Sequence, residues 1–156
     1  MKRLICSALA AAALLAAPPN PVTWKLSGAP AKPVKAGARF SVKLTANIQQ
    51  GWHIYSMKPI EDGPLPTRIW LAEGQPFQAA GPIQGDEPQT LQDPTLHMDV
   101  ELYEGMTAFA VPVKAAAGAA PGTQNLVVNA QAQSCNNSIC LPMTTVKVEI
   151  PVTIAK

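Results

Sequence analysis

The sequence predicts an all-β fold, a single immunoglobulin-like antiparallel β-sandwich, and three observations support this prediction. Apolar and polar residues alternate with a period of two, 16 prolines and 10 glycines provide many short connections, and no segment shows convincing helical spacing. Hydrophobic residues make up 47% of the 156-residue chain, which is enough to build a core. Because each alternating strand buries one face, two packed layers are expected, with a small barrel as the alternative.

The chain begins with the pattern of a secretory signal peptide over residues 1–17. Lys2 and Arg3 precede an apolar run from Leu4 to Ala17, and cleavage is expected between residues 13 and 20. A run of this length is too short to span a bilayer comfortably, and no other segment reaches eighteen apolar residues. We therefore expect export to a bacterial periplasm, no stable membrane insertion, and a single folded domain over residues 22–154.

Two stretches show the strand pattern most clearly. Between Arg39 and Ile48 every second residue is apolar, and the same alternation runs from Val146 to Ile154. Pro151 interrupts the second stretch and cannot donate a ladder hydrogen bond, which predicts a sheet edge or a bulge there. Further strands are expected at Val22–Leu26, Trp52–Met57, Thr67–Leu71, Met106–Val113 and Leu126–Ser134.

Loop length and charge add two expectations. The stretch from Pro82 to Val100 is long for a plain connection, so we expect a functional lid or a disordered loop. Loss of Lys2 and Arg3 with the leader reduces the 12 Lys and Arg residues to ten, equal to the 10 Asp and Glu residues. A formal charge of zero provides no electrostatic basis for binding nucleic acid.

Two cysteines remain in the mature chain, Cys135 and Cys140, and four residues separate them. In an oxidising compartment a disulfide is the default, although so short a ring contributes only about 2 kcal/mol of stability. Alternation from Leu126 onward predicts that Cys135 lies off the core, on the face opposite Ala132. A close and partly exposed pair suits reversible thiol-disulfide exchange, but the residues alone favour a redox pair and an inert hairpin staple equally.

A metal site is the alternative chemistry. His53 and His97 could join the cysteines, and nearby methionines could complete a soft Cu(I) site, but the spacing matches no finger or ribbon pattern. We therefore expect no bound metal. The sequence contains no phosphate-binding loop or Ser/His/Asp set that would indicate a hydrolase.

Five short motifs occur together and in order along the chain. They are G-W-H-I-Y-S at 51–56, G-P-L-P-T at 63–67, Y-E-G at 103–105, F-A-V-P-V at 109–113 and C-N-N-S-I-C-L-P at 135–142. Together they resemble the periplasmic N-terminal domain of the thiol:disulfide interchange protein DsbD, over roughly residues 22–154. The resemblance implies an immunoglobulin-like sandwich whose cysteine pair carries electrons from a thioredoxin-like donor to oxidised periplasmic proteins.

The same resemblance implies roles for individual residues. Cys140 matches the exposed sulfur that forms the mixed disulfide, and Cys135 matches its resolving partner. His53 and Tyr55 match aromatic neighbours of the pair, and the loop from Asp93 to Met98 matches a cap over it. Relatives can place a phenylalanine in this cap, where this chain has Leu96, His97 and Met98.

The cap region also carries two carboxylates, Asp93 and Asp99. A carboxylate close to the sulfurs raises the thiol pKa and keeps the cysteines in their less reactive form until a partner docks. Replacement of both by amides is expected to lower that pKa, which the pH dependence of the iodoacetamide rate would measure.

Complete relatives continue into a membrane domain and a C-terminal thioredoxin-like domain, whereas this chain stops at Lys156. With no flavin or nicotinamide signature and no cofactor expected, it is predicted to be a relay of the protein-disulfide reductase type. It would receive electrons from a thioredoxin-like or membrane donor and pass them to an oxidised periplasmic protein. The alternative is a non-catalytic binding module, a soft-metal carrier or a docking domain with an inert disulfide.

Overall fold

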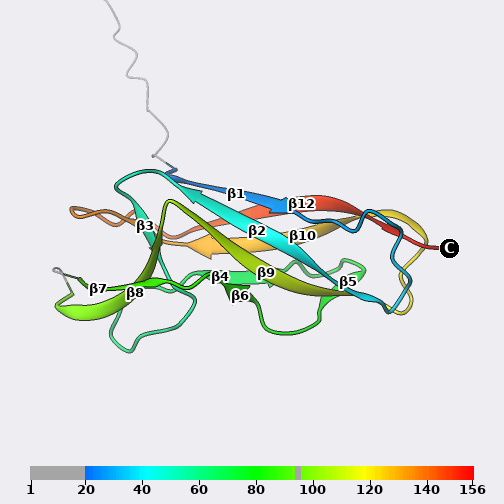
Figure 1. Cartoon of the computed structure of the whole chain (residues 1–156), viewed down its shortest axis with the longest axis horizontal. Helices are drawn as coiled ribbons and strands as arrows, with labels where there is room; N and C mark the ends of the chain where they lie inside the picture. The colour runs from blue at the N-terminus through cyan, green and yellow to red at the C-terminus, as the bar shows by residue number, and fades with distance from the viewer. Residues whose placement is uncertain (1–19, 94–95) are drawn as a thin grey trace, which may run out of the picture.

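The computed structural model describes residues 20–93 and 96–156, so the expected signal peptide at residues 1–17 lies outside the described residues. These residues form twelve β-strands in three sheets (Figure 1). All pairings between named strands are antiparallel. In the described part of the chain, no helix is long and apolar enough to cross a bilayer.

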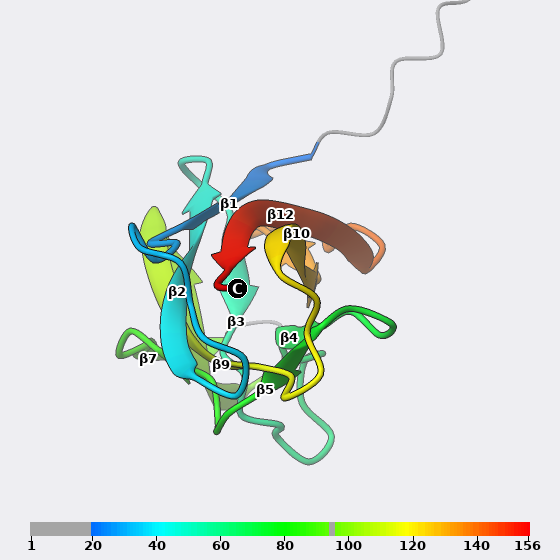
Figure 2. The ribbon, with the colours of Figure 1, turned by 90° about the vertical axis from the view of Figure 1, so that its right-hand side faces the viewer.

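Two of the sheets form the layers of a sandwich. In the first sheet the order is β1 (Val22–Ser27), β2 (Arg39–Ile48), β9 (Met106–Ala115) and β5 (Phe77–Ala79), and β6 (Gln84–Gly85) pairs with β9 beside β5. In the second sheet the order is β12 (Thr144–Ile154), β10 (Gly122–Ala132) and β4 (Arg68–Leu71). Seen along the long axis, β2 and β9 lie on one side of the molecule and β10 and β12 on the other (Figure 2).

The sandwich core follows the alternation read from the sequence. On β2 the buried residues are Val42, Leu44, Ala46 and Ile48, and on β10 they include Leu126, Val128, Ala130 and Ala132. Phe109, Val111 and Val113 of β9 fill the space between the layers. The expected all-β sandwich is confirmed. Pro151 also lies where it was expected, because β12 forms the edge of its sheet.

The third sheet lies at the end of the molecule remote from the C-terminus (Figure 1). Its order is β11 (Ser134–Cys135), β3 (His53–Tyr55), β8 (Met98–Glu104) and β7 (Gln89–Asp93). One face of this sheet carries Ile54 and Tyr103, which belong to the sandwich core. The opposite face has a second core, made of Tyr55, Val100, Leu102 and Cys135.

The expectation of a long loop from Pro82 to Val100 is wrong for most of that stretch. It contains β6, β7 and the start of β8, and β7 pairs with β8 as a hairpin. The residues of β7 read Gln-Thr-Leu-Gln-Asp, and only Asp93 among them is buried, so the strand has no apolar alternation to reveal it. Its backbone forms a strand because β8 offers a free edge beside it.

Candidate functional site

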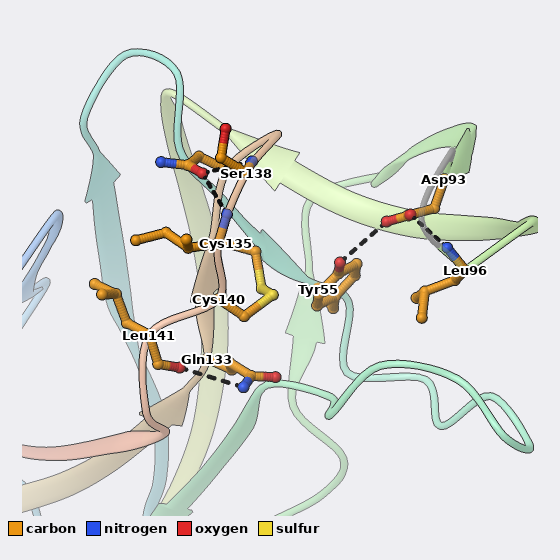
Figure 3. The surroundings of a disulfide bond; sticks show 10 residues. Tyr55, Asp93, Leu96, Gln133, Cys135, Ser138, Cys140 and Leu141 are labelled. Carbon is orange, nitrogen blue, oxygen red and sulfur yellow. Dashed lines mark hydrogen bonds between the residues drawn. A yellow bond between two sulfur atoms is a disulfide. The ribbon is translucent and has the colours of Figure 1, made fainter.

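The two cysteines are joined in a disulfide at the tip of a short hairpin. The two sulfur atoms are 2.04 Å apart and the Cα atoms 4.1 Å apart, and the residues form an antiparallel bridge. Between them, the side-chain oxygen Oδ1 of Asn136 accepts hydrogen bonds from the backbone N–H groups of Ser138 (2.8 Å) and Ile139 (2.9 Å). An asparagine side chain that bonds the backbone ahead of it stabilises a tight turn. These hydrogen bonds hold the turn that joins the two cysteines (Figure 3).

The two cysteines differ sharply in their exposure to solvent. Cys135 is 1% exposed and belongs to the second core, whereas Cys140 is exposed. The expectation that Cys135 lies off the core is wrong, although its side chain does lie on the face opposite the sandwich core. That face has its own apolar cover in Tyr55, Val100 and Leu102. Only Cys140 is open to an incoming partner.

A cavity of about 220 Å³ lies beside Cys140. It is bounded by the cysteine hairpin on one side and by the third sheet and two loops on the other. We call it the cysteine pocket; its lining residues are Tyr55, Pro64, Asp93, Leu96, Gln133, Asn136, Ser138, Ile139 and Cys140. In Figure 3 the ring of Tyr55 stands between the disulfide and Asp93.

Asp93 connects the pocket to the β7–β8 turn, whose described residues are Asp93 and Leu96 to Met98. The hydroxyl of Tyr55 donates to Oδ2 of Asp93 at 3.2 Å, and the backbone N–H of Leu96 donates to Oδ1 at 2.9 Å. The pKa of Tyr55 is raised to about 12. Burial is the largest cause, followed by the charge of Asp93 and by the hydrogen bond from the Tyr55 hydroxyl to Asp93. The phenol therefore keeps its proton near neutral pH and holds the turn against the sheet.

The expected cap residues have different surroundings. Leu96 lines the cysteine pocket, Met98 packs against the second core, and His97 is exposed outside the pocket with a left-handed backbone (φ 54°). Pro94 and Thr95 lie outside the described residues. Asp99 is exposed and does not line the pocket. Of the two carboxylates in this region, Asp93 is the one that lines the pocket with Cys140.

His53 lies beside the buried cysteine, not in the cysteine pocket. It is directly opposite Cys135 in the β3–β11 pair, and its ring centroid is 5.2 Å from that of Tyr55. Burial lowers the pKa of His53, while the negative charges of Glu104 and Asp93 oppose that shift. Among the described residues, nothing forms a hydrogen bond with the buried Nε2 atom of this ring.

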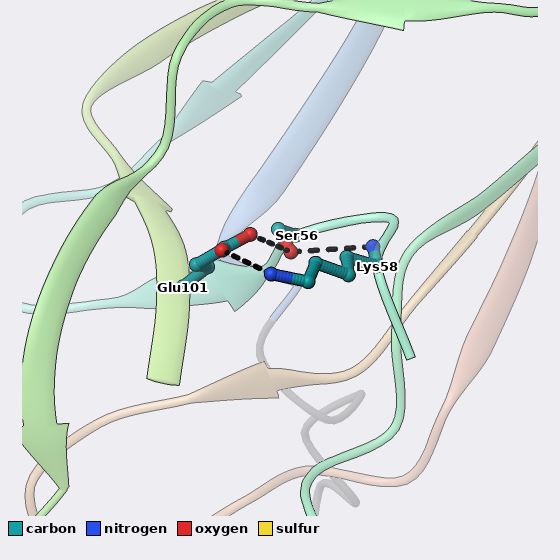
Figure 4. Close-up of polar contacts among 3 residues, drawn as sticks. All are labelled: Ser56, Lys58 and Glu101. Carbon is teal, nitrogen blue, oxygen red and sulfur yellow. Dashed lines mark hydrogen bonds and ion pairs between the residues drawn. The ribbon is translucent and has the colours of Figure 1, made fainter. Parts of the chain in front are cut away.

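A loop from Ser56 to Thr67 brings Pro64 to the pocket, and polar contacts close its base. Lys58 Nζ donates to Glu101 Oε1 at 2.9 Å, and Ser56 Oγ donates to Glu101 Oε2 at 3.2 Å (Figure 4). The hydrogen bond from Lys58 is the main reason why the pKa of Glu101 is lowered. Thr67 Oγ1 donates to the backbone oxygen of Tyr55 at 2.6 Å, so both ends of the loop are tied to β3 and β8.

Three exposed apolar side chains come from the segments that border the pocket. Leu96 is 39% exposed, Ile139 54% and Leu65, next to Pro64, 49%. Leu96 and Ile139 line the pocket themselves, so part of the surface around Cys140 is apolar. Sequence reasoning missed Pro64, Gln133 and the residues between the cysteines. The last of these could have been inferred from the C-x4-C spacing, whereas Pro64 reaches the pocket only through tertiary structure.

A larger cavity of about 600 Å³ lies between β4 and the β5–β9 edge, but Arg68 is its only charged lining residue and neither cysteine reaches it. Within residues 20–93 and 96–156, no group of three or more His, Cys, Asp or Glu side chains could hold a metal ion. The cysteine pocket is therefore the candidate site.

The comparison with protein families matches this chain to one family. The family described as "Thiol:disulfide interchange protein DsbD, N-terminal" matches residues 26–151, which is most of the chain. The chain belongs to the DsbD N-terminal domain family. No curated protein matches the sequence.

Two solved structures share the fold of this DsbD N-terminal family member. The N-terminal domain of DsbD from Neisseria meningitidis, in the reduced form, has a TM-score of 0.50 and 16% identity, covering 76% of this chain and 82% of that one. The N-terminal periplasmic domain of ScsB from Proteus mirabilis has a TM-score of 0.57 and 14% identity. That match covers 87% of this chain but only 49% of the ScsB chain.

Proposed function

We propose that this protein exchanges thiols and disulfides in the periplasm through the Cys135–Cys140 pair. It would take electrons from a thioredoxin-like or membrane donor and pass them to an oxidised periplasmic protein. The observation that carries the proposal is the unequal exposure of the two sulfurs, because Cys135 is 1% exposed and Cys140 opens to a pocket. An exchange pair needs one sulfur that a partner can reach and a second one, close by, that resolves the mixed disulfide.

Each half of the exchange has a defined balance of atoms and electrons. In the reduced protein the Cys140 thiolate attacks the partner's disulfide, and one partner sulfur leaves as a thiolate. The Cys135 thiolate then attacks Cys140 Sγ, which restores the Cys135–Cys140 disulfide and releases the partner's second sulfur. Two electrons pass to the partner, whose disulfide becomes a dithiol. Reduction by the donor runs through the same steps in reverse, starting with attack on Cys140.

Family membership and the apolar surface support a protein partner. The DsbD N-terminal family implies thioredoxin-like redox partners, and Leu65, Leu96 and Ile139 provide an apolar contact area around Cys140. Exposed apolar patches are typical of surfaces that bind other proteins. The expected leader at residues 1–17 and the periplasmic ScsB domain of similar fold support the periplasmic location.

The reduction potential of the Cys135–Cys140 pair tests this function. The purified mature protein is equilibrated in thiol redox buffers, quenched, alkylated under denaturing conditions and weighed by mass spectrometry. We expect a potential of about −200 to −270 mV, the range of exchange carriers. A value below about −300 mV would identify a structural bond and contradict the proposed function.

Single cysteine variants test the order of events. Cys135→Ser should trap a mixed disulfide between Cys140 and an oxidised thioredoxin-like protein, because the resolving sulfur is missing. Cys140→Ser should trap none, because Cys135 is buried. Equal trapping by the two variants would contradict the assignment of Cys140 as the attacking sulfur.

A further inference from the structure

Cys135, His53 and Glu104 form one cross-strand row of the third sheet. Cys135 is directly opposite His53 in the β11–β3 pair, and His53 is directly opposite Glu104 in the β3–β8 pair. Directly opposed residues of an antiparallel pair have Cβ atoms about 4.5–5.5 Å apart and side chains on the same face. His53 therefore lies between Cys135 and Glu104 in this row, and the three side chains share one face of the sheet. Neither the pocket nor the sequence motifs reveal this juxtaposition.

The Nε2 atom of His53 is the feature of this row that needs explanation. It is buried, and no described residue forms a hydrogen bond with it. Buried polar atoms in proteins are nearly always paired, and a redox or catalytic role is one explanation for an exception. In the disulfide Cys135 carries no proton, whereas the reduced Cys135 thiol offers one directly across the strand pair.

The groups around the ring favour a neutral imidazole that can gain a proton. Burial lowers the pKa of His53, which keeps the ring neutral near pH 7. The ionisable groups that face it are Glu104 on β8, Asp93 at the end of β7, and Tyr55 on β3. The two carboxylates stabilise the protonated ring, and the Tyr55 phenol stays neutral. The ring can therefore take up a proton and release it again.

We propose that His53 is the general base that accepts the thiol proton of Cys135 when this sulfur resolves the mixed disulfide on Cys140. The inference rests on the proposed exchange function and assigns a role that the cysteines cannot fill. A buried thiol ionises poorly, and only the thiolate is an effective nucleophile. A base beside Cys135 makes the second step efficient while the thiol stays protected from solvent.

The Cys135 proton passes to Nε2 of His53, and the resulting thiolate attacks Cys140 Sγ. The bond between Cys140 Sγ and the partner's sulfur breaks, and the partner leaves as a thiolate that is protonated by solvent. His53 then returns its proton to solvent. In the reverse direction the protonated ring supplies a proton to the Cys135 thiolate as the disulfide opens.

The experiment uses the reduced full-length mature protein and an aromatic disulfide whose thiolate product absorbs light. The first absorbance phase reports attack by Cys140 and depends on reagent concentration. The second phase reports resolution by Cys135 and is independent of that concentration. We expect His53→Gln to slow the second phase at pH 7 by on the order of 100-fold, the lower end for general-base catalysis, and to leave the first phase unchanged.

The pH profile separates a base from a structural support. In the unmutated protein the second phase should reach a plateau above the pKa of His53, because the base is then neutral. In His53→Gln it should rise about tenfold per pH unit up to the thiol pKa, because only pre-formed thiolate reacts. In Glu104→Gln the acid limb of the second-phase profile should lie at lower pH than in the unmutated protein, because Glu104 raises the pKa of His53.

His97→Asn is the matched control, because His97 is exposed outside the pocket and asparagine tolerates its left-handed backbone. Both of its phases should match the unmutated protein. If folded His53→Gln has the second-phase rate of the unmutated protein, or if His97→Asn is slowed to the same extent, the role of His53 is overturned. The exchange function is not affected by either result. Absence of the second phase in the unmutated protein would overturn both the exchange function and the role of His53.

A measurement without mutation covers the case in which His53→Gln does not fold. NMR titration of the reduced unmutated protein gives the pKa of His53, which should coincide with the acid limb of the second phase. If the rate of the second phase keeps rising through that pH and shows no change of slope at the pKa of His53, the proposal is overturned.

Discussion

At the scale of single residues, Asp93 is the carboxylate of the cysteine pocket that we expect to influence Cys140. It lines the same cavity as the exposed sulfur and accepts hydrogen bonds from both Tyr55 and Leu96. A negative charge close to a thiol disfavours the thiolate and raises the thiol pKa. We therefore expect the carboxylate to protect the reduced pair from oxidants without blocking the pocket.

Asp93→Asn should lower the pKa of the Cys140 thiol by on the order of one unit. The amide removes the charge but keeps an oxygen that can accept the hydrogen bond from Leu96, so the turn should be preserved. The measurement is the iodoacetamide rate of the reduced protein as a function of pH. Asp99→Asn is the control, because Asp99 is exposed outside the pocket. An equal change in both variants would contradict a local effect of Asp93.

At the scale of elements, the β7–β8 hairpin contributes Asp93 and Leu96 to the pocket beside Cys140. Its two strands pair over five residues each, and its turn is tied to β3 through the Tyr55 hydroxyl. Among the described residues of this turn, Leu96 is the apolar side chain that lines the pocket. The shielding residue of this chain is therefore expected to be Leu96 and not His97 or Met98.

Leu96→Ala should increase severalfold the rate at which iodoacetamide modifies Cys140 in the reduced protein, because part of the apolar cover is removed. Leu91→Ala is a matched control on the same hairpin. The two leucines are similarly exposed, at 39% and 37%, but Leu91 does not line the pocket. Iodoacetamide rates measured at several pH values distinguish a change in the accessibility of Cys140 from a change in its thiol pKa. Equal rates in Leu96→Ala and the unmutated protein would show that this leucine does not shield the sulfur.

At the scale of the whole molecule, the structure has two apolar cores, and the second of them contains the buried cysteine. Leu44, fully buried, belongs to the sandwich core, and Leu102, 1% exposed, belongs to the second core with Cys135. A buried leucine replaced by alanine costs about 2–5 kcal/mol wherever the cavity cannot collapse. Substitutions in the two cores should therefore lower the free energy of unfolding to a similar extent. Their effects on the accessibility of Cys135 should differ.

We expect both Leu44→Ala and Leu102→Ala to lower the free energy of unfolding by about 2–5 kcal/mol in urea. Only Leu102→Ala should also speed the alkylation of Cys135 in the reduced native protein, because it opens the cover of that sulfur. The check is peptide mass spectrometry after native labelling. Faster labelling of Cys135 in Leu44→Ala to the same extent would mean that the two cores open together.

The sequence predicts the sandwich better than the site, and the reason is the range of the interactions involved. The alternation in β2 and β12 is a local pattern, so both strands were expected close to their observed bounds. By contrast, β7 has no alternation, and β8 supplies its pairing partner across a turn. The burial of Cys135 depends on Tyr55, Val100 and Leu102, which are distant in sequence.

The positions of the candidate residues divide in the same way. The cysteine pair and its short separation can be read directly, and the resemblance predicts an exposed Cys140. The place of His53 opposite Cys135 depends on the register between strands about eighty residues apart in sequence. A single-sequence argument contains no information on that register.

The placement of the cysteine pocket also bears on how this domain can diverge over evolution. None of the pocket residues lies in a strand of the two sandwich sheets; they come from β3, the end of β7, and loops. The long strands are therefore free to accumulate substitutions wherever an apolar residue continues to face the core. Identity of 16% with a retained fold, as seen with the Neisseria meningitidis domain, is the outcome that such freedom produces. Substitutions in the strands of the two sandwich sheets, and substitutions in the pocket that change the preferred partner, can then occur independently.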